Sequence, residues 1–74
     1  MQKTIDLHGY NLENAIMMIE REIGKIRLSG EENDILAITG RGIIRGELIN
    51  YLKSHHINHH FQLGNDGAIV IHVE

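Results

Sequence analysis

The sequence predicts an α/β two-layer sandwich, in which a mixed four-stranded sheet carries two helices on one face. Three observations predict this fold: strand-like and helix-like segments alternate, each helical segment has one apolar stripe, and the sequence closes with two strand-like runs joined by a turn. Strands joined through a helix run parallel, whereas strands joined by a tight turn run antiparallel. The predicted order is therefore β-α-β-α-β-β, in one domain over residues 1–74.

The first strand is predicted from alternation. Over residues 3–8, Ile5 and Leu7 fall on one side and Asp6 and His8 on the other, which is the period-two pattern of a half-buried strand. Asp6 and His8 are therefore expected to point the same way.

One apolar stripe predicts the first helix, from an N-cap at Asn11 to about Leu28. The Ser-Gly pair at 29–30 ends it. A solvated acidic loop at 31–34 follows, and the apolar run 35–39 predicts a strand that is buried on both faces. The stripe consists of Leu12, Ala15, Ile16, Ile19, Ile23 and Ile26.

A second helix is predicted to about Ser54, because apolar residues again recur at helical spacing. Two strand-like runs follow, at 57–63 and 68–73. Between them lies GNDG, whose Asp-Gly step is typical of a hairpin turn. The helical repeat consists of Ile44, Leu48, Tyr51 and Leu52.

Composition excludes several classes of protein. Without cysteine, the chain has no disulfide framework, no thiolate metal site and no cysteine nucleophile. It has no export signal and no run of about 18 apolar residues, so we expect a soluble, cytoplasmic protein that does not enter a membrane. The net charge of −3 disfavours nucleic-acid binding, but acidic residues cluster in the first half, which leaves room for a basic patch around Arg41, Arg45 and Lys53.

Two polar groups of residues follow predicted strands. Asp6, His8 and Gly9 close the first strand, and residues 39–42 (TGRG) close the second. In α/β folds, ligands collect beyond the carboxyl ends of parallel strands. If the two strands are neighbours, both groups lie on one rim of the sheet.

The segment 39–46, TGRGIIRG, has two interpretations. Glycines let a backbone approach a ligand closely, the following helix offers unpaired N–H groups, and Arg41 and Arg45 carry forked donors, all of which suit a phosphate. Alternatively, the glycines only permit a strand-to-helix turn. The spacing matches neither a Walker A motif nor GxGxxG.

Asp6 and His8 also leave two interpretations open. The carboxylate can orient an imidazole that moves protons near neutral pH, or it can accept backbone hydrogen bonds at the strand end beside a half-exposed histidine. Thr39 is either a hydroxyl that bonds a phosphate or a β-branched strand terminus. Tyr10 is the one aromatic residue placed to stack a base near this rim.

The histidine-rich segment 55–60, HHINHH, contains pairs of histidines four residues apart. That spacing brings two ligands to one metal only on a helix. Here a helix end passes into a strand, so we expect the histidines to diverge. No metal ligand and no cofactor is predicted.

Taken together, these segments resemble the Smr (small MutS-related) domain family. Its pattern combines an LD-x-H-G strand end with a [HT]G-x-G loop, and residues 5–9 (IDLHG) and 39–42 (TGRG) match it in order, with Ile5 in place of leucine. The resemblance extends over essentially the whole chain. Many members read HGKGTG before the second helix, whereas here Thr39 stands at the histidine position and the loop is two residues shorter.

The resemblance implies a fold similar to the C-terminal domain of translation initiation factor three. It also implies nucleic-acid binding, with DNA or RNA as partner and in many members metal-independent endonuclease or nicking activity, and it leaves room for a larger MutS-like or ribosomal assembly. The alternative is a non-catalytic module that binds nucleic acid, ribosome or a protein through the same rim. By resemblance, the catalytic residues are Asp6 and His8, and the phosphate-binding residues are Thr39, Gly40, Arg41, Gly42 and Arg45.

Overall fold

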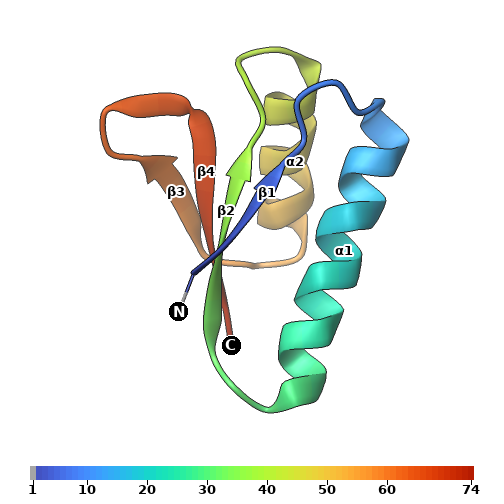
Figure 1. The fold of residues 1–74 in the computed structure, drawn as a ribbon, viewed down its shortest axis with the longest axis vertical. Helices are drawn as coiled ribbons and strands as arrows, with labels where there is room; N and C mark the ends of the chain where they lie inside the picture. Colours follow the sequence, from blue (N-terminus) through green and yellow to red (C-terminus); the bar gives the residue numbers. More distant parts are fainter. Residues whose placement is uncertain (1) are drawn as a thin grey trace.

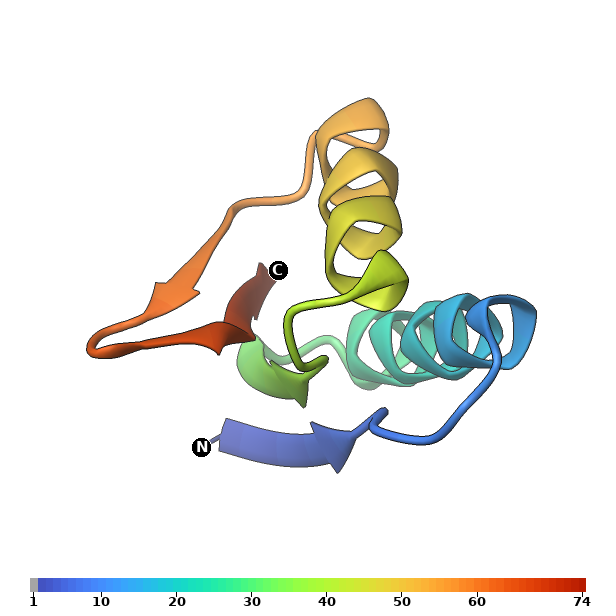
Figure 2. The ribbon, with the colours of Figure 1, turned by 90° about the horizontal axis from the view of Figure 1, so that it is seen from above.

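A computed structural model of the protein describes residues 2–74, and over this range it confirms the predicted sandwich and the order β-α-β-α-β-β (Figure 1). Both helices cover the same face of a four-stranded sheet (Figure 2). Within the described residues, no helix is long and apolar enough to cross a membrane. The elements are β1 (Gln2–Asp6), α1 (Leu12–Ser29), β2 (Asn33–Ile38), α2 (Ile43–Ser54), β3 (His59–Gln62) and β4 (Asn65–Val73).

The strand order is β1-β2-β4-β3, so β2 lies inside the sheet. It pairs in parallel with β1 and antiparallel with β4. At the carboxyl end of the parallel pair, Asp6 lies beside Ile38, and the amide of Leu7 donates to the carbonyl of Ile38 at 2.8 Å. The two predicted strand ends are therefore neighbours, as the shared rim requires.

The core lies between the sheet and the helices. Strand residues alternate between faces, so Ile35 and Ala37 of β2 are fully buried against the helices. The stripe predicted for α1 supplies Ala15, Ile19 and Ile23 to the same core. Burying each isoleucine contributes roughly 1.5–3 kcal/mol before entropy is counted. The sandwich is thus stabilised along one continuous apolar layer, completed by Ile5, Leu7, Ile26, Leu48, Leu52, Ile57, Ile69, Ile71 and Val73.

The first helix begins and ends as the sequence predicts. The side chain of Asn11 accepts from the amide of Asn14 at 2.8 Å, which satisfies one of the unpaired N–H groups of the first turn. Gly30 ends the helix in the left-handed region at φ 75°, where its amide donates to the carbonyl of Arg27.

Two predicted boundaries are wrong. The first strand ends at Asp6 and not at His8, because a turn starts at His8 and continues through Gly9 at φ 87°. The hairpin turn is formed by residues 63–64 and not by the Asp-Gly step, which lies inside β4. Gly64, at φ 77°, supplies the positive φ that this tight turn needs.

Other strand boundaries shift less. The second strand starts at Asn33, within the segment predicted to be an acidic loop. The third strand is shorter than the predicted 57–63 and covers only His59–Gln62.

A charged residue lies at the edge of the core on α1. Glu22 is buried, and its carboxylate accepts from Nζ of Lys3 at 2.8 Å, with Nζ of Lys25 at 3.5 Å. The hydrogen bond from Lys3 lowers the pKa of Glu22 from its ordinary value, although burial opposes the shift. The folded state therefore favours the charged carboxylate.

We predict that this ion pair makes stability depend on pH. A carboxylate whose pKa is lowered on folding stabilises the native state above its unfolded pKa, and that stability is lost as the pH falls below the ordinary value of 4.5. Urea unfolding of the wild type and Glu22→Gln between pH 7 and pH 3 measures this loss. The wild type should lose more stability than the variant as the pH falls. Parallel plots of unfolding free energy against pH would show that Glu22 contributes nothing to the pH dependence.

Candidate functional site

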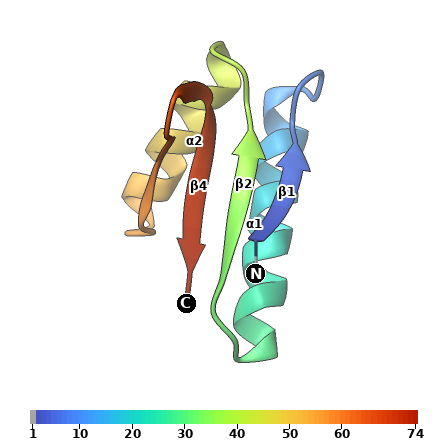
Figure 3. The same ribbon diagram turned by 60° about the vertical axis from the view of Figure 1, so that its left-hand side comes forward.

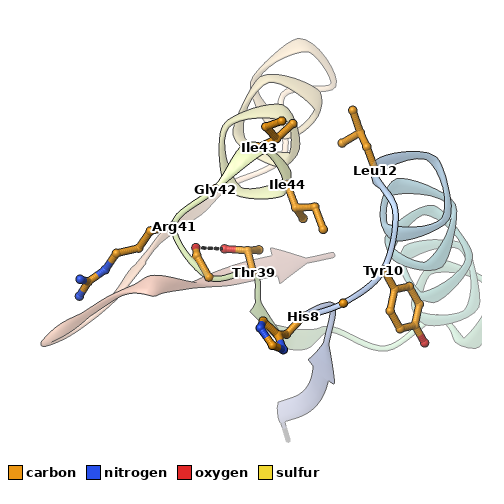
Figure 4. Close-up of a pocket in the computed structure, with 10 residues that line it drawn as sticks. His8, Tyr10, Leu12, Thr39, Arg41, Gly42, Ile43 and Ile44 are labelled. Atoms are coloured by element: carbon orange, nitrogen blue, oxygen red, sulfur yellow. Dashed lines mark hydrogen bonds between the residues drawn. The ribbon is translucent and has the colours of Figure 1, made fainter.

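The loops after β1 and β2 meet above the carboxyl ends of the two strands and enclose a pocket of about 570 Å³. We call it the rim pocket; it is lined by residues 8–10, Leu12 and residues 39–44 (Figure 4). Five of the seven predicted site residues line it: His8, Thr39, Gly40, Arg41 and Gly42. Asp6 and Arg45 are not part of its lining.

The TGRG loop is held from behind by β4. The carbonyl of Gly67 accepts from the amides of Thr39 and Gly40, both at 2.9 Å, and from the hydroxyl of Thr39 at 3.2 Å. That hydroxyl also lies 2.8 Å from the carbonyl of Gly40, and Thr39 is only 5% exposed. The geometry thus gives the Thr39 hydroxyl a role in fixing the loop, which neither interpretation from the sequence included.

This attachment requires close backbone approach. A Cβ atom added to Gly67 would lie 3.5 Å from Cα of Gly40 and 3.3 Å from Oδ1 of Asn65. Gly40 itself turns through φ 69°, a conformation that side chains rarely adopt. Gly40 therefore fits the turn interpretation, and the loop also borders the rim pocket.

The first turn of α2 faces the rim pocket with its amides uncapped. Gly42 occupies the N-cap position and provides no side-chain hydrogen bond, in contrast to Asn11 at the start of α1. The first amides of a helix have no partner inside it, and they carry the positive end of the helix dipole. Since Gly42, Ile43 and Ile44 line the pocket, an anion is favoured there.

Both predicted arginines are paired with one acidic residue. Nε of Arg41 donates to Oδ1 of Asp66 at 2.7 Å, and Nη1 of Arg45 donates to the carbonyl of Asp66 at 3.1 Å. Arg45 also lies over the ring of Phe61, with 5.5 Å from Cζ to the centroid. Figure 4 shows Arg41 directed away from His8. Both guanidinium groups therefore contact the hairpin; Arg41 lines the rim pocket, and Arg45 lies outside its lining.

Sequence reasoning missed Asp66, because it placed this residue in the predicted hairpin turn GNDG. Arg41 and Asp66 are 25 residues apart, so no local pattern connects them. The side chain of Arg41 is nevertheless 72% exposed and that of Asp66 55%, which makes the pair an accessible one.

Of the two interpretations of Asp6 and His8, the geometry has the backbone hydrogen bond at the strand end and not a contact between carboxylate and imidazole. Oδ1 of Asp6 accepts from the backbone amide of His8 at 2.9 Å. Because β1 ends at Asp6, this bond shapes the turn that carries His8 to the rim, where its ring lines the pocket (Figure 4). Among the described residues, the His8 ring has no hydrogen-bond partner.

The histidines of 55–60 make contacts with separate parts of the molecule. Nδ1 of His55 lies 2.9 Å from the carbonyl of Tyr51, and Nδ1 of His59 lies 2.8 Å from that of Ile57. His60 contacts His72 on the neighbouring strand. Over residues 2–74, no group of three or more histidine, aspartate or glutamate side chains could hold a metal ion.

The fold, with DLHG and TGRG on one rim, defines a class of domain. The model of the Smr domain family matches residues 5–74, and the chain therefore belongs to the Smr domain family. It is 34% identical over 76 residues to the endonuclease MutS2 of Ligilactobacillus salivarius, in a match that covers 93% of this chain. It is 38% identical over 64 residues to the endonuclease MutS2 of Acetivibrio thermocellus, in a match that covers 85% of this chain.

These relatives are much longer proteins. The matched region covers 10% of the Ligilactobacillus salivarius protein and 8% of that from Acetivibrio thermocellus. A third endonuclease MutS2, from Brevibacillus brevis, is 34% identical over 64 residues, with 85% of this chain and 8% of the relative covered.

We predict that replacing Thr39 with valine destabilises the protein by about 1 kcal/mol, the typical net value of one hydrogen bond. The change keeps the shape of the side chain but removes its bonds to the carbonyls of Gly40 and Gly67. Urea unfolding measures the difference, and Thr39→Ser, which retains the hydroxyl, serves as the control. A valine variant as stable as the wild type would show that the hydroxyl does not anchor the loop.

Proposed function

We propose that this Smr domain binds the phosphate backbone of DNA or RNA at the rim pocket and acts there as an endonuclease or nicking module. The observation that carries the proposal is the uncapped first turn of α2, which opens into a pocket beside His8 and Arg41. The three curated relatives are named endonucleases, which supports the same class of activity.

Backbone amides provide the first part of the binding. A phosphate in the rim pocket accepts from the amides at the start of α2, where the helix dipole favours negative charge. Arg41 provides the second part. Its exposed ion pair with Asp66 is worth only about 0.2–1 kcal/mol, so the guanidinium can exchange that carboxylate for a phosphate with two parallel bonds.

His8 provides the chemistry. A phosphate held at α2 lies in the pocket that the imidazole also lines. A neutral imidazole can take a proton from a water molecule as its oxygen bonds to phosphorus; the bond from phosphorus to the leaving ester oxygen breaks, and that oxygen takes a proton from solvent. The helix amides and Arg41 then neutralise the charge that develops on the phosphate. Asp6 acts through the backbone, because its bond to the amide of His8 sets the turn that presents the ring. No metal takes part in this step.

A second candidate is a module that binds nucleic acid, ribosome or a protein without cleaving. Two observations favour it: Asp66 engages both arginines, and among the described residues nothing holds the His8 ring in one orientation. Under this alternative, the loops fix the shape of a binding rim only. We place cleavage first because of the three relatives.

Cleavage should depend on His8. We expect His8→Ala to slow the cutting of structured DNA and RNA substrates by about 100- to 10,000-fold, the usual contribution of a general acid or base. Asp6→Ala should also slow it, since the turn loses its bond. His55→Ala is the matched control, because His55 lies at the C-terminal end of α2. Equal cutting by the wild type and the three variants would reject the mechanism. Wild-type protein that binds the substrates without cutting them would establish the second candidate.

Binding should become tighter when Asp66 is neutralised. Asp66→Asn removes the carboxylate charge that faces Arg41 and Arg45, while Arg45 keeps its bond to the backbone carbonyl of residue 66. We expect the dissociation constant for a single-stranded oligonucleotide to fall by about 1.5- to 5-fold, the value of an exposed ion pair. Fluorescence anisotropy at fixed salt measures it. Glu31→Gln changes the net charge equally in the loop before β2 and serves as the control. Equal effects of the two changes would mean that only total charge matters.

A further inference from the structure

The sheet has a second face, which neither helix covers (Figure 3). At the end of β2 opposite the rim, three polar side chains of neighbouring strands meet on this face. Asp34 of β2 pairs in register with His72 of β4. His60 of β3 pairs with Val70, two residues before His72, so its side chain lies on the same face. None of the three belongs to the rim pocket.

These side chains form a chain of contacts. Oδ1 of Asp34 lies 2.9 Å from Nδ1 of His72, and Nε2 of His72 lies 3.0 Å from Nδ1 of His60. When Nδ1 of His72 donates to the carboxylate, Nε2 carries a lone pair that is directed at His60. The two ring centroids are 4.8 Å apart with 28° between the planes.

The separation of the two nitrogens suits a metal ion. Imidazole nitrogens bind Zn²⁺ at about 2.0–2.1 Å. Two such bonds at a right angle place the nitrogens about 2.9 Å apart, and at a tetrahedral angle about 3.3 Å apart. The observed 3.0 Å lies within this range. In a metal-binding histidine, the ring nitrogen that does not bind the metal commonly donates to a carboxylate. This hydrogen bond fixes the tautomer and makes the other nitrogen a more basic ligand.

We propose that His60 and His72 bind one divalent transition-metal ion, such as Zn²⁺ or Cu²⁺, with Asp34 orienting His72. The site is open to solvent, since 37% of the His72 side chain and 42% of that of Asp34 are exposed. Water fills the remaining positions around the ion. Imidazole donors favour Cu²⁺ over Zn²⁺. The ion joins β3 to β4, and it stabilises the native state because the unfolded chain does not hold the two rings together.

Metal titration of the tag-free chain tests this site. With zinc chloride in a calorimeter, we expect one ion per chain, and with Cu²⁺ an electron paramagnetic resonance spectrum with two imidazole nitrogens. His60→Gln and His72→Gln should each abolish the one-site isotherm, and Asp34→Asn should weaken binding by about 10- to 100-fold. His55→Gln and His8→Gln should bind Zn²⁺ with the affinity of the wild type.

Thermal unfolding provides a second measurement. Added Zn²⁺ should raise the melting temperature of the wild type but not that of His60→Gln, a variant of an exposed residue on the edge strand β3. Wild-type protein that takes up no metal would overturn the proposal, and so would unchanged uptake by His60→Gln. The rim pocket lies at the other end of β2, so this result is independent of whether His8 cleaves nucleic acid.

Discussion

The site depends on one carbonyl oxygen, that of Gly67, which accepts from two amides and one hydroxyl of the TGRG loop. These bonds fix the loop where the chain leaves β2, and they bring β4 so close that a Cβ atom on Gly67 would already contact the backbone of Gly40, at 3.5 Å from its Cα. The loop can then start α2 at the rim with its first amides open to the pocket. In the site that we propose, Thr39 and Gly40 act through position, and the amides at the start of α2, which have no side-chain cap, receive the anion.

The same stretch of β4 also controls the charge of the rim. Asp66, the residue before the anchor, pairs with Arg41 and Arg45 and draws both guanidinium groups toward the hairpin. In the site that we propose, the amides at the start of α2, which have no net charge, therefore make the first contacts with an anion. A chain with a net charge of −3 can in this way offer an anion site without a broad basic surface.

Local patterns were sufficient to predict the element order, the N-cap of α1 at Asn11 and its end at Gly30, because each depends on neighbouring residues. The rule for parallel strands was sufficient to predict that the ends of β1 and β2 share a rim. The rest depends on contacts between distant segments. The contact of His60 with His72 and the contacts of Asp66 depend on how β3 pairs with β4. That pairing is set by the turn at 63–64, whereas the sequence pattern predicted a turn at the Asp-Gly step. The position of His8 depends on where β1 ends, which periodicity does not determine to one residue.

The central claim is that the first turn of α2 and the turn after β1 form one anion-binding rim. Backbone amide chemical shifts, followed during titration of the ¹⁵N-labelled chain with a short single-stranded oligonucleotide, test it most directly. The account predicts that the largest shifts fall on residues 42–45 and 8–9, and that β3 and the uncovered face of the sheet change little. Shifts concentrated on that face, with the rim unchanged, would contradict it.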